Sequence, residues 1–240
     1  IFFGLAMADF PVWINVIATT VIVGCIGVAI QKLTFSPIKS KNSYTPMLAS
    51  IGVGIFLQAA VTLFAGTDIK TYDRSFLESY SFLNEKLFIT NLQIIIIITS
   101  TLLMLGLFAF LKYTKTGKAI RAVADNRESA EIVGINSEKI TTIIFFIASG
   151  ITTVAGILIG YQNNLHPTMG IALIIKAFTA VIIGGIGNIP AAITGAYVIG
   201  IAENLAIGIT INGFSIPAGY KDAVAFILLI VFLLMRPQGI

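Results

Sequence analysis

The charged residues of this 240-residue chain lie far apart, and the stretches between them are long and apolar. Only 11% of the residues are Asp, Glu, Lys or Arg, whereas soluble domains carry about a quarter. Uncharged intervals of 22, 26 and 25 residues separate Asp9 from Lys32, Lys41 from Asp68, and Lys86 from Lys112. A helix needs about 20 apolar residues to cross the hydrocarbon of a bilayer. The chain is therefore predicted to be an integral membrane protein.

The remaining intervals extend this prediction to seven helical spans. Lys139 and Lys176 enclose 36 uncharged residues, which is more than one span and less than two. The apolar runs lack the alternation of barrel strands, so helices are favoured. We expect an all-α, polytopic helical bundle that forms one transmembrane domain over residues 1–240, with spans at 11–31, 47–65, 92–111, 140–160, 171–187, 191–210 and 219–235.

The distribution of Lys and Arg between the loops predicts the orientation. Alternating the spans places ten of these residues on the side that holds loop 32–46, loop 112–139 and the C-terminus, and four on the other side. Cytoplasmic loops carry the excess of positive charge. We therefore expect 112–139 and the C-terminus in the cytoplasm and loop 66–91 outside. The chain starts with Ile in an apolar segment, so we also expect at least one earlier span before Ile1.

Several function classes are excluded by what the sequence contains. One cysteine, Cys25, cannot form an internal disulfide, and the single His166 has no companion ligands for a metal. The only Gly-Lys pair, Gly117–Lys118, is followed by Ala119, so there is no phosphate-binding loop of the GKS or GKT type. No residues are spaced as a catalytic triad or a carboxylate pair. We expect neither an enzyme nor a resident cofactor, and a net charge of +4 is too small to indicate nucleic acid binding.

The cytoplasmic loop 112–139 is patterned as two short amphipathic helices. Gly117 ends the preceding span, and Asp125 or Asn126 can cap the second short helix. Gly134 is placed to end that helix in a left-handed conformation. Such a pair of surface helices is suited to docking a cytoplasmic protein. They can equally shield the inner face of the bundle or bind anionic lipid.

This loop also carries a resemblance to a known family. The segment TKTGKAIRAVADNRESAEIVGIN (114–136) resembles the cytoplasmic loop of permeases from branched-chain amino-acid ABC transporters. Further similar blocks follow in family order: LASIGVGIFLQ (48–58), HPTMG (166–170), KAFTAVIIGGIGNIPAAITGAYVIGIAENL (176–205) and YKDAVAFILLIVFLLMRPQG (220–239). The chain resembles the shorter, first-permease type. It departs from the family at Ala191, where glycine is common and another small residue stands here.

The resemblance implies a permease subunit of an importer in the inner or plasma membrane of a bacterium or archaeon. It implies a second permease subunit, related or identical, two ATPase subunits that bind ATP and Mg²⁺, and an external substrate-binding protein. Loop 112–139 is the equivalent of the segment that couples to the ATPase in this family. The coupling residues we expect are Gly117, Arg121, Ala122, Asp125, Ala130 and Gly134.

A few polar or glycine residues inside the predicted spans are candidates for the translocation pathway. They are Gln58, Lys176, Gly184, Gly185 and Glu203. A lysine in the bilayer costs about 2.5–3.5 kcal/mol on insertion scales, so it either snorkels to the interface or faces water. Glu203 needs a partner, and Lys176 is one candidate because their helices are expected to be neighbours. Gln58 can instead serve an ordinary interhelical hydrogen bond.

Two alternatives remain open from the sequence. Lys176 and Glu203 could be an ion- or proton-linked pair in a self-sufficient secondary transporter or channel. An importer of the same family could also carry urea, short amides or other amino acids. Outside, loop 66–91 contains Tyr72, Phe76, Tyr80 and Phe82, and it is either a docking surface for an external partner or a solvated, partly helical loop.

Overall fold

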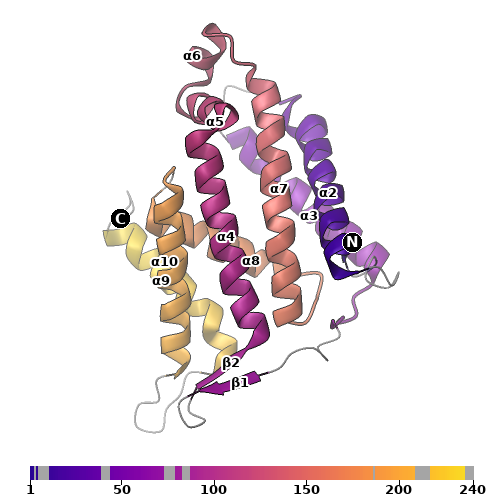
Figure 1. The fold of residues 1–240 in the computed structure, drawn as a ribbon, viewed down its shortest axis with the longest axis vertical. Coiled ribbons are helices and arrows are strands. Elements are labelled where there is room, and N and C mark those ends of the chain that lie inside the picture. Colours follow the sequence, from indigo (N-terminus) through magenta and orange to yellow (C-terminus); the bar gives the residue numbers. More distant parts are fainter. Residues whose placement is uncertain are drawn as a thin grey trace. The chain divides into compact units, whose positions relative to one another are not determined.

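The computed structural model describes residues 1–2, 4, 11–38, 44–72, 79–82, 87–185, 187–208 and 217–235. The chain divides into two compact units, Ile1–His166 and Pro167–Ile240, drawn from indigo to pink and from orange to yellow in Figure 1. The expectation of one permease domain over the whole chain stays a prediction. Several residues counted in the charge and loop arguments lie outside the described residues: Asp9, Lys39, Lys41, Asp73, Arg74, Phe76, Glu78, Glu85, Lys86 and Arg236.

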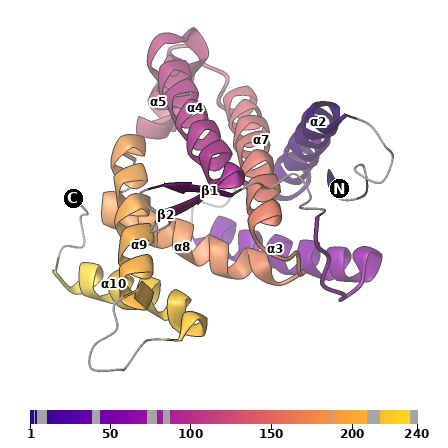
Figure 2. The same ribbon diagram turned by 60° about the horizontal axis from the view of Figure 1, so that its bottom comes forward.

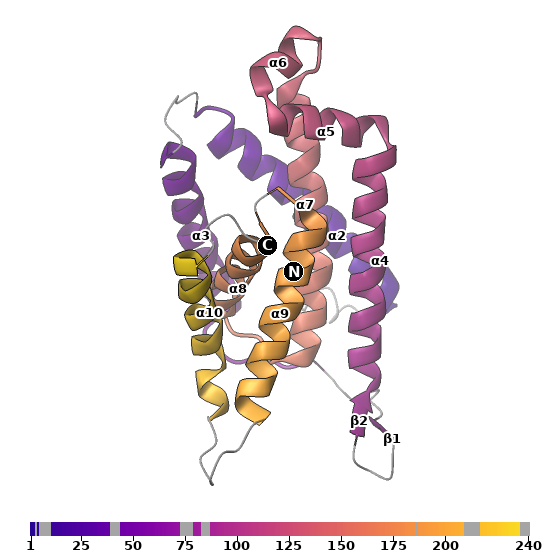
Figure 3. The same ribbon diagram turned by 90° about the vertical axis from the view of Figure 1, so that its left-hand side faces the viewer.

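Within its described residues, the first unit contains four long helices, two short ones and a β-hairpin. The long helices are α2 (Val12–Ile30), α3 (Tyr44–Ala65), α4 (Asn91–Tyr113) and α7 (Ser137–Gln162). Helix α2 continues into a π-helical turn, η1 (Gln31–Phe35). The short helices α5 (Lys115–Asp125) and α6 (Arg127–Ile132) follow α4 and precede α7. Figures 1 and 3 show both at one end of α4 and α7, with the hairpin at the other end of α4.

Helices α2 and α7 pack closely because small residues of α2 face side chains of α7. A Cβ added to Gly24 would lie 2.7 Å from the Phe146 ring, and one added to Gly27 would collide with the Ser149 side chain. Close approach of this kind drives helix association in lipid, where burial of apolar surface gives no advantage. Nearer the start of α7, the Thr142 hydroxyl donates to the buried Gln31 side chain at 3.1 Å.

Among the described residues, the end of the first unit opposite α5 and α6 contains a β-hairpin and a single β-bridge. Strands β1 (Ser79–Phe82) and β2 (Leu87–Thr90) form an antiparallel hairpin before α4. The described residues 79–82 and 87–90 of loop 66–91 are thus extended, which differs at these residues from the partly helical alternative. A second pairing joins the backbones of Lys70 and Leu165 at 3.0 and 2.7 Å. These ladders satisfy backbone groups that a structureless loop would leave to water.

Next to that pairing, an aromatic cluster holds the loop against the end of α7. The rings of Tyr72 and Tyr161 stack at 4.6 Å, and Phe2 meets Tyr72 edge to face at 5.5 Å. Burial, and to a lesser degree the neighbouring Tyr161, raise the pKa of Tyr72 to about 12. A Cβ added to Gly160 would lie 2.8 Å from the Tyr72 ring, so only glycine leaves room for it. Tyr72 therefore works as an anchor between loop and helix.

The described part of the second unit is a group of three helices, α8 (Met169–Gly184), α9 (Ile189–Gly208) and α10 (Lys221–Met235), with a 3-10 turn, η2 (Ala218–Tyr220), before α10. Its core consists of Ala180, Ile183, Ile199 and Ala225, one or two from each helix. Figure 2 shows α8, α9 and α10 in this unit. The helices that carry Lys176 and Glu203, α8 and α9, are neighbours, which confirms the prediction.

Glycines allow the tight junction between α8 and α9. Gly185 and Gly187 both have φ of 95°, which side-chain-bearing residues rarely adopt. A Cβ added to Gly184 would collide with the backbone of Ala191, and one added to Gly195 would collide with the carbonyl of Ala180. The backbones of α8 and α9 are therefore in direct contact at this junction.

Helices occur at all seven predicted spans, and five of them are long and apolar enough to cross a bilayer. These five are Val12–Phe35, Leu48–Ala65, Asn91–Tyr113, Ser137–Gln162 and Ile189–Gly208. The spans predicted at 171–187 and 219–235 are shorter than expected, because α8 has 16 residues and α10 has 15. Helix α8 ends early where Gly185 turns the backbone. The all-α membrane architecture is confirmed, with the small hairpin as an addition.

Candidate functional site

Helices α5 and α6 form a protrusion, called here the knob (residues 115–134), whose ends are fixed by caps. The Thr114 hydroxyl accepts from the Gly117 N–H at 2.9 Å, and the Asn126 side chain accepts from the Ser129 N–H at 2.9 Å. Of the two capping residues considered from the sequence, Asn126 is the one used, and Asp125 is the last residue of α5. Each cap satisfies a backbone donor that the helix itself leaves free.

The knob ends at a left-handed glycine, as predicted. Gly134 has φ of 87°, its N–H donates to the Glu131 carbonyl, and the Ile135 N–H donates to the Ala130 carbonyl, both at 3.0 Å. This pair of bonds is the Schellman arrangement that closes helix C-termini. Because the chain reverses within two residues, α6 leads directly into α7.

The attachment of the knob to α4 depends on two of the predicted coupling residues. Gly117 is buried, and a Cβ added to it would lie 2.6 Å from the Cα and carbonyl oxygen of Leu111. Arg121 donates from Nη1 to that same carbonyl at 2.6 Å. A cation at the end of a helix also complements its dipole. Both residues therefore hold α5 across the end of α4, and Figure 3 shows α5 in this position.

The other predicted coupling residues differ in exposure, and two apolar residues were missed. Ala122 and Asp125 are exposed, whereas Ala130 is the buried residue of α6. At the tip, Ile132 and Val133 are 85% and 74% exposed. Apolar side chains at the end of a knob, beyond the bilayer-length helices, are typical of a surface that another protein covers. No polarity pattern in the sequence distinguished them from residues of the knob's own core.

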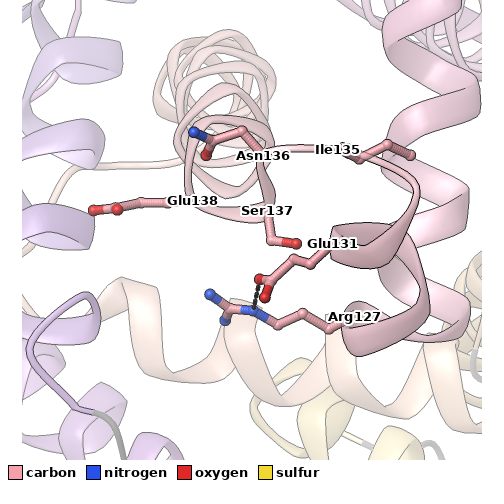
Figure 4. A pocket seen from close by; sticks show the side chains of 7 residues that line it. Arg127, Glu131, Ile135, Asn136, Ser137 and Glu138 are labelled. Atoms are coloured by element: carbon pink, nitrogen blue, oxygen red, sulfur yellow. Dashed lines mark hydrogen bonds and ion pairs between the residues drawn. The ribbon is translucent and has the colours of Figure 1, made fainter.

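A shallow pocket lies where α6 meets the start of α7, and Figure 4 shows its lining. Arg127 and Glu131 form an ion pair at 3.2 Å on the surface of α6. The Ser137 hydroxyl is buried and points toward the Glu131 carboxylate, without a hydrogen bond of good geometry among the described residues. The neighbouring Ser137 hydroxyl and, to a lesser degree, the paired Arg127 guanidinium hold the pKa of the Glu131 carboxyl below its usual value. The junction thus favours an ionised Glu131.

A second candidate site lies in the second unit, where Lys176 meets two carboxylates. The Lys176 ammonium lies 3.0 Å from Oε1 and 3.1 Å from Oε2 of Glu203, and 2.8 Å from Oδ1 of Asp222. We call these three residues the charge triad. The Glu203 side chain is 6% exposed, that of Lys176 is 27% exposed and that of Asp222 is 54% exposed. The triad therefore extends from a buried carboxylate to an accessible one.

Each member of the triad comes from a different helix. Lys176 is near the middle of α8, Glu203 is five residues before the end of α9, and Asp222 is in the first turn of α10. At 1.5 Å per residue, the triad lies about 7 Å from the end of α9. Lys176 was one candidate partner for Glu203 from the sequence, and Asp222 was not among the candidates. A carboxylate is favoured there by the helix N-terminus.

The remaining predicted pathway residues are not part of the triad. Gln58 lies half-buried on α3 in the first unit, where the Thr62 hydroxyl donates to its backbone carbonyl at 2.9 Å. Gly184 and Gly185 form the junction between α8 and α9. Their observed contacts are those of a packed turn, and a direct part in the pathway stays a prediction.

Bilayer-length helices, a capped knob and a charge triad that joins three helices together are typical of a multi-pass membrane permease. Comparison with known families agrees: the chain belongs to the family described as branched-chain amino acid transport system, permease component, which matches residues 1–233. The resemblance noted in the sequence is therefore confirmed. Membership implies partner subunits in general, since the family is one component of a transport system.

Individual relatives are similar over most of the chain. The high-affinity branched-chain amino acid transport system permease protein BraD of Pseudomonas aeruginosa is 36% identical over 228 residues, which is 93% of this chain and 72% of the relative. The corresponding permease protein LivH of Escherichia coli K12 is 34% identical over 229 residues, with the same coverage. The fructose import permease protein FruG of Bifidobacterium longum is more distant, at 25% identity over 80% of this chain and 58% of the relative. No solved structure matches the chain.

Proposed function

We propose that this chain is the transmembrane permease subunit of an ATP-driven importer that translocates branched-chain amino acids. The family and the relatives named for this cargo support the proposal. In it, the chain hydrolyses no ATP itself and holds no cofactor. Two cytoplasmic ATPase subunits bind ATP and Mg²⁺, a second permease subunit, related or identical, completes the pore, and an external binding protein delivers the cargo.

The observation that carries the proposal is the knob. Arg121 joins α5 to the end of α4, the cap at Asn126 begins α6, and the turn at Gly134 ends α6 just before α7. Ile132 and Val133 are exposed at the tip of the knob. A rigid protrusion with an apolar tip can fit a groove on an ATPase and transmit its movement to two long helices.

In the proposed mechanism, nucleotide binding closes the ATPases and displaces the knob. Because α5 is hydrogen-bonded to the end of α4 and α6 leads directly into α7, both helices follow that displacement. The permease then changes between outward- and inward-facing packings, and the ATPase needs only to bind one of them more tightly. The knob and the C-terminus lie in the cytoplasm in this arrangement, and the β1–β2 hairpin lies outside.

Variants of the knob test this proposal. Ile132→Asp places a charge on the tip, and Arg121→Glu removes the bond that ties α5 to α4. We expect Ile132→Asp to release the ATPase during co-purification, and Arg121→Glu to retain it while the uptake per ATP hydrolysed falls. Lys118→Ala, an exposed position of α5 away from the tip, is the matched control. Normal uptake per ATP in both test variants would rule out coupling through the knob.

A further inference from the structure

The charge triad contains one carboxylate more than its single ammonium group requires. Lys176 lies within 3.1 Å of Glu203 and of Asp222, so one of the two acids can leave without stripping the lysine of a counter-charge. Glu203 is the fixed partner, because its side chain is buried at 6% exposure. Asp222 is the partner that can leave, because its side chain is 54% exposed.

The contact between Lys176 and Glu203 can hold the lysine on its own. Both carboxylate oxygens of Glu203 lie within 3.1 Å of the Lys176 ammonium, whereas Asp222 meets it through Oδ1 at 2.8 Å. Opening the contact to Asp222 therefore leaves Lys176 paired with a buried carboxylate.

We propose that Lys176 and Asp222 open to bind the zwitterionic head of an α-amino acid. The cargo carboxylate takes the place of Asp222 beside the Lys176 ammonium, and the cargo ammonium pairs with the released Asp222 carboxylate. The exchange conserves charge, since one ion pair becomes two and each partner is monovalent. Glu203 keeps Lys176 in position throughout and acts as a positioning residue. This inference rests on the proposed function, because it assumes an amino-acid cargo.

The surroundings of the triad suit the rest of such a cargo. Phe226 lies one helical turn after Asp222 on the same face of α10, and its side chain is 42% exposed. It offers an apolar surface to a branched side chain beside the charged head. The Lys221 ammonium lies 3.5 Å from the Asn204 side chain, and the ion pair of Asp222 among the described residues is with Lys176.

The test is direct binding to the complete permease–ATPase complex in nanodiscs, without the binding protein, by titration calorimetry. The ligands are L-leucine, leucinamide, which lacks the carboxylate, and 4-methylpentanoate, which lacks the ammonium. We expect leucine to bind, and each analogue to bind about tenfold more weakly or worse, as is usual when a charged hydrogen-bond partner is removed. Leucinamide binding as tightly as leucine would overturn the zwitterion site, and so would the absence of leucine binding to the wild-type complex.

Variants of Asp222 separate binding from folding. Asp222→Asn should weaken leucine binding about tenfold, whereas Asp222→Glu keeps the charge and should restore most of the affinity. Lys221→Gln is the matched control, because it removes a charge from the adjacent position without touching the triad. Wild-type affinity in Asp222→Asn would overturn the proposal.

Failure of this inference is distinguishable from failure of the proposed function. Uptake of leucine by the wild-type complex with its binding protein and ATP is measured first. Absence of that uptake would refute the proposed function itself. Normal uptake together with unchanged leucine binding in Asp222→Asn would refute only the zwitterion site.

Discussion

Replacing Lys176 by methionine should destabilise the second unit, because it leaves Glu203 buried without a counter-charge. Breaking a fully buried ion pair from one side costs about 3–5 kcal/mol. The Lys176 side chain is 27% exposed, so solvent screens part of this loss, and we expect about 2–3 kcal/mol. For a chain of this size each kcal/mol lowers the midpoint of unfolding by about 2–4 °C, which gives a decrease of about 4–12 °C.

The double variant Lys176→Met/Glu203→Gln decides whether the loss comes from the pair. Removing both charges leaves no buried carboxylate, so we expect the double variant to recover to within about 1 kcal/mol of the wild-type chain. The assay is thermal unfolding of the purified protein in one detergent, followed by size-exclusion chromatography. A double variant as unstable as the sum of the two single variants would refute the reasoning, because it would show no coupling between the two side chains.

Three further predictions concern packing, capping and pH. Gly195→Val should cost about 1–3 kcal/mol by collision with α8, whereas Gly200→Val in the same helix, with open space around it, should cost far less in thermal unfolding. Asn126→Ala should cost about 1 kcal/mol and speed hydrogen exchange in α6 about fivefold. Folding lowers the pKa of Glu131, so the ionised carboxylate stabilises the folded state. This contribution to stability is complete above the pKa of the unfolded state and is lost as the pH falls through the pKa of the folded state. Acidification should therefore raise exchange at 131–137, relative to intrinsic rates, in wild type and not in Glu131→Gln.

Much of the architecture could be predicted from where charges are absent. A charge inside the hydrocarbon is costly, so the intervals between charges mark the helices even without knowledge of their contacts. The same argument fails for α8 and α10. Helix α8 ends where Gly185 takes a positive φ, and composition alone does not show which glycine of a cluster will do so.

The site was predicted in parts, for a related reason. Gly117, Arg121 and Gly134 were singled out from a family resemblance, but the bond from Arg121 to the Leu111 carbonyl depends on how α5 folds back on α4. Asp222 falls at the start of the span expected at 219–235, and nothing in the sequence pairs it with Lys176. Only the packing of α10 against α8 brings it to 2.8 Å from Lys176. Contacts between helices set these roles, and a single sequence does not record them.

The energy source for uptake tests most directly whether this chain is a permease driven by ATP through partner subunits. The chain is reconstituted in vesicles with its partner permease, ATPases and binding protein, and leucine entry is measured with ATP or with a proton gradient alone. We predict uptake that requires ATP and every partner and that is insensitive to an uncoupler of the proton gradient. Uptake by the chain alone under a proton gradient would contradict the account and identify a secondary transporter.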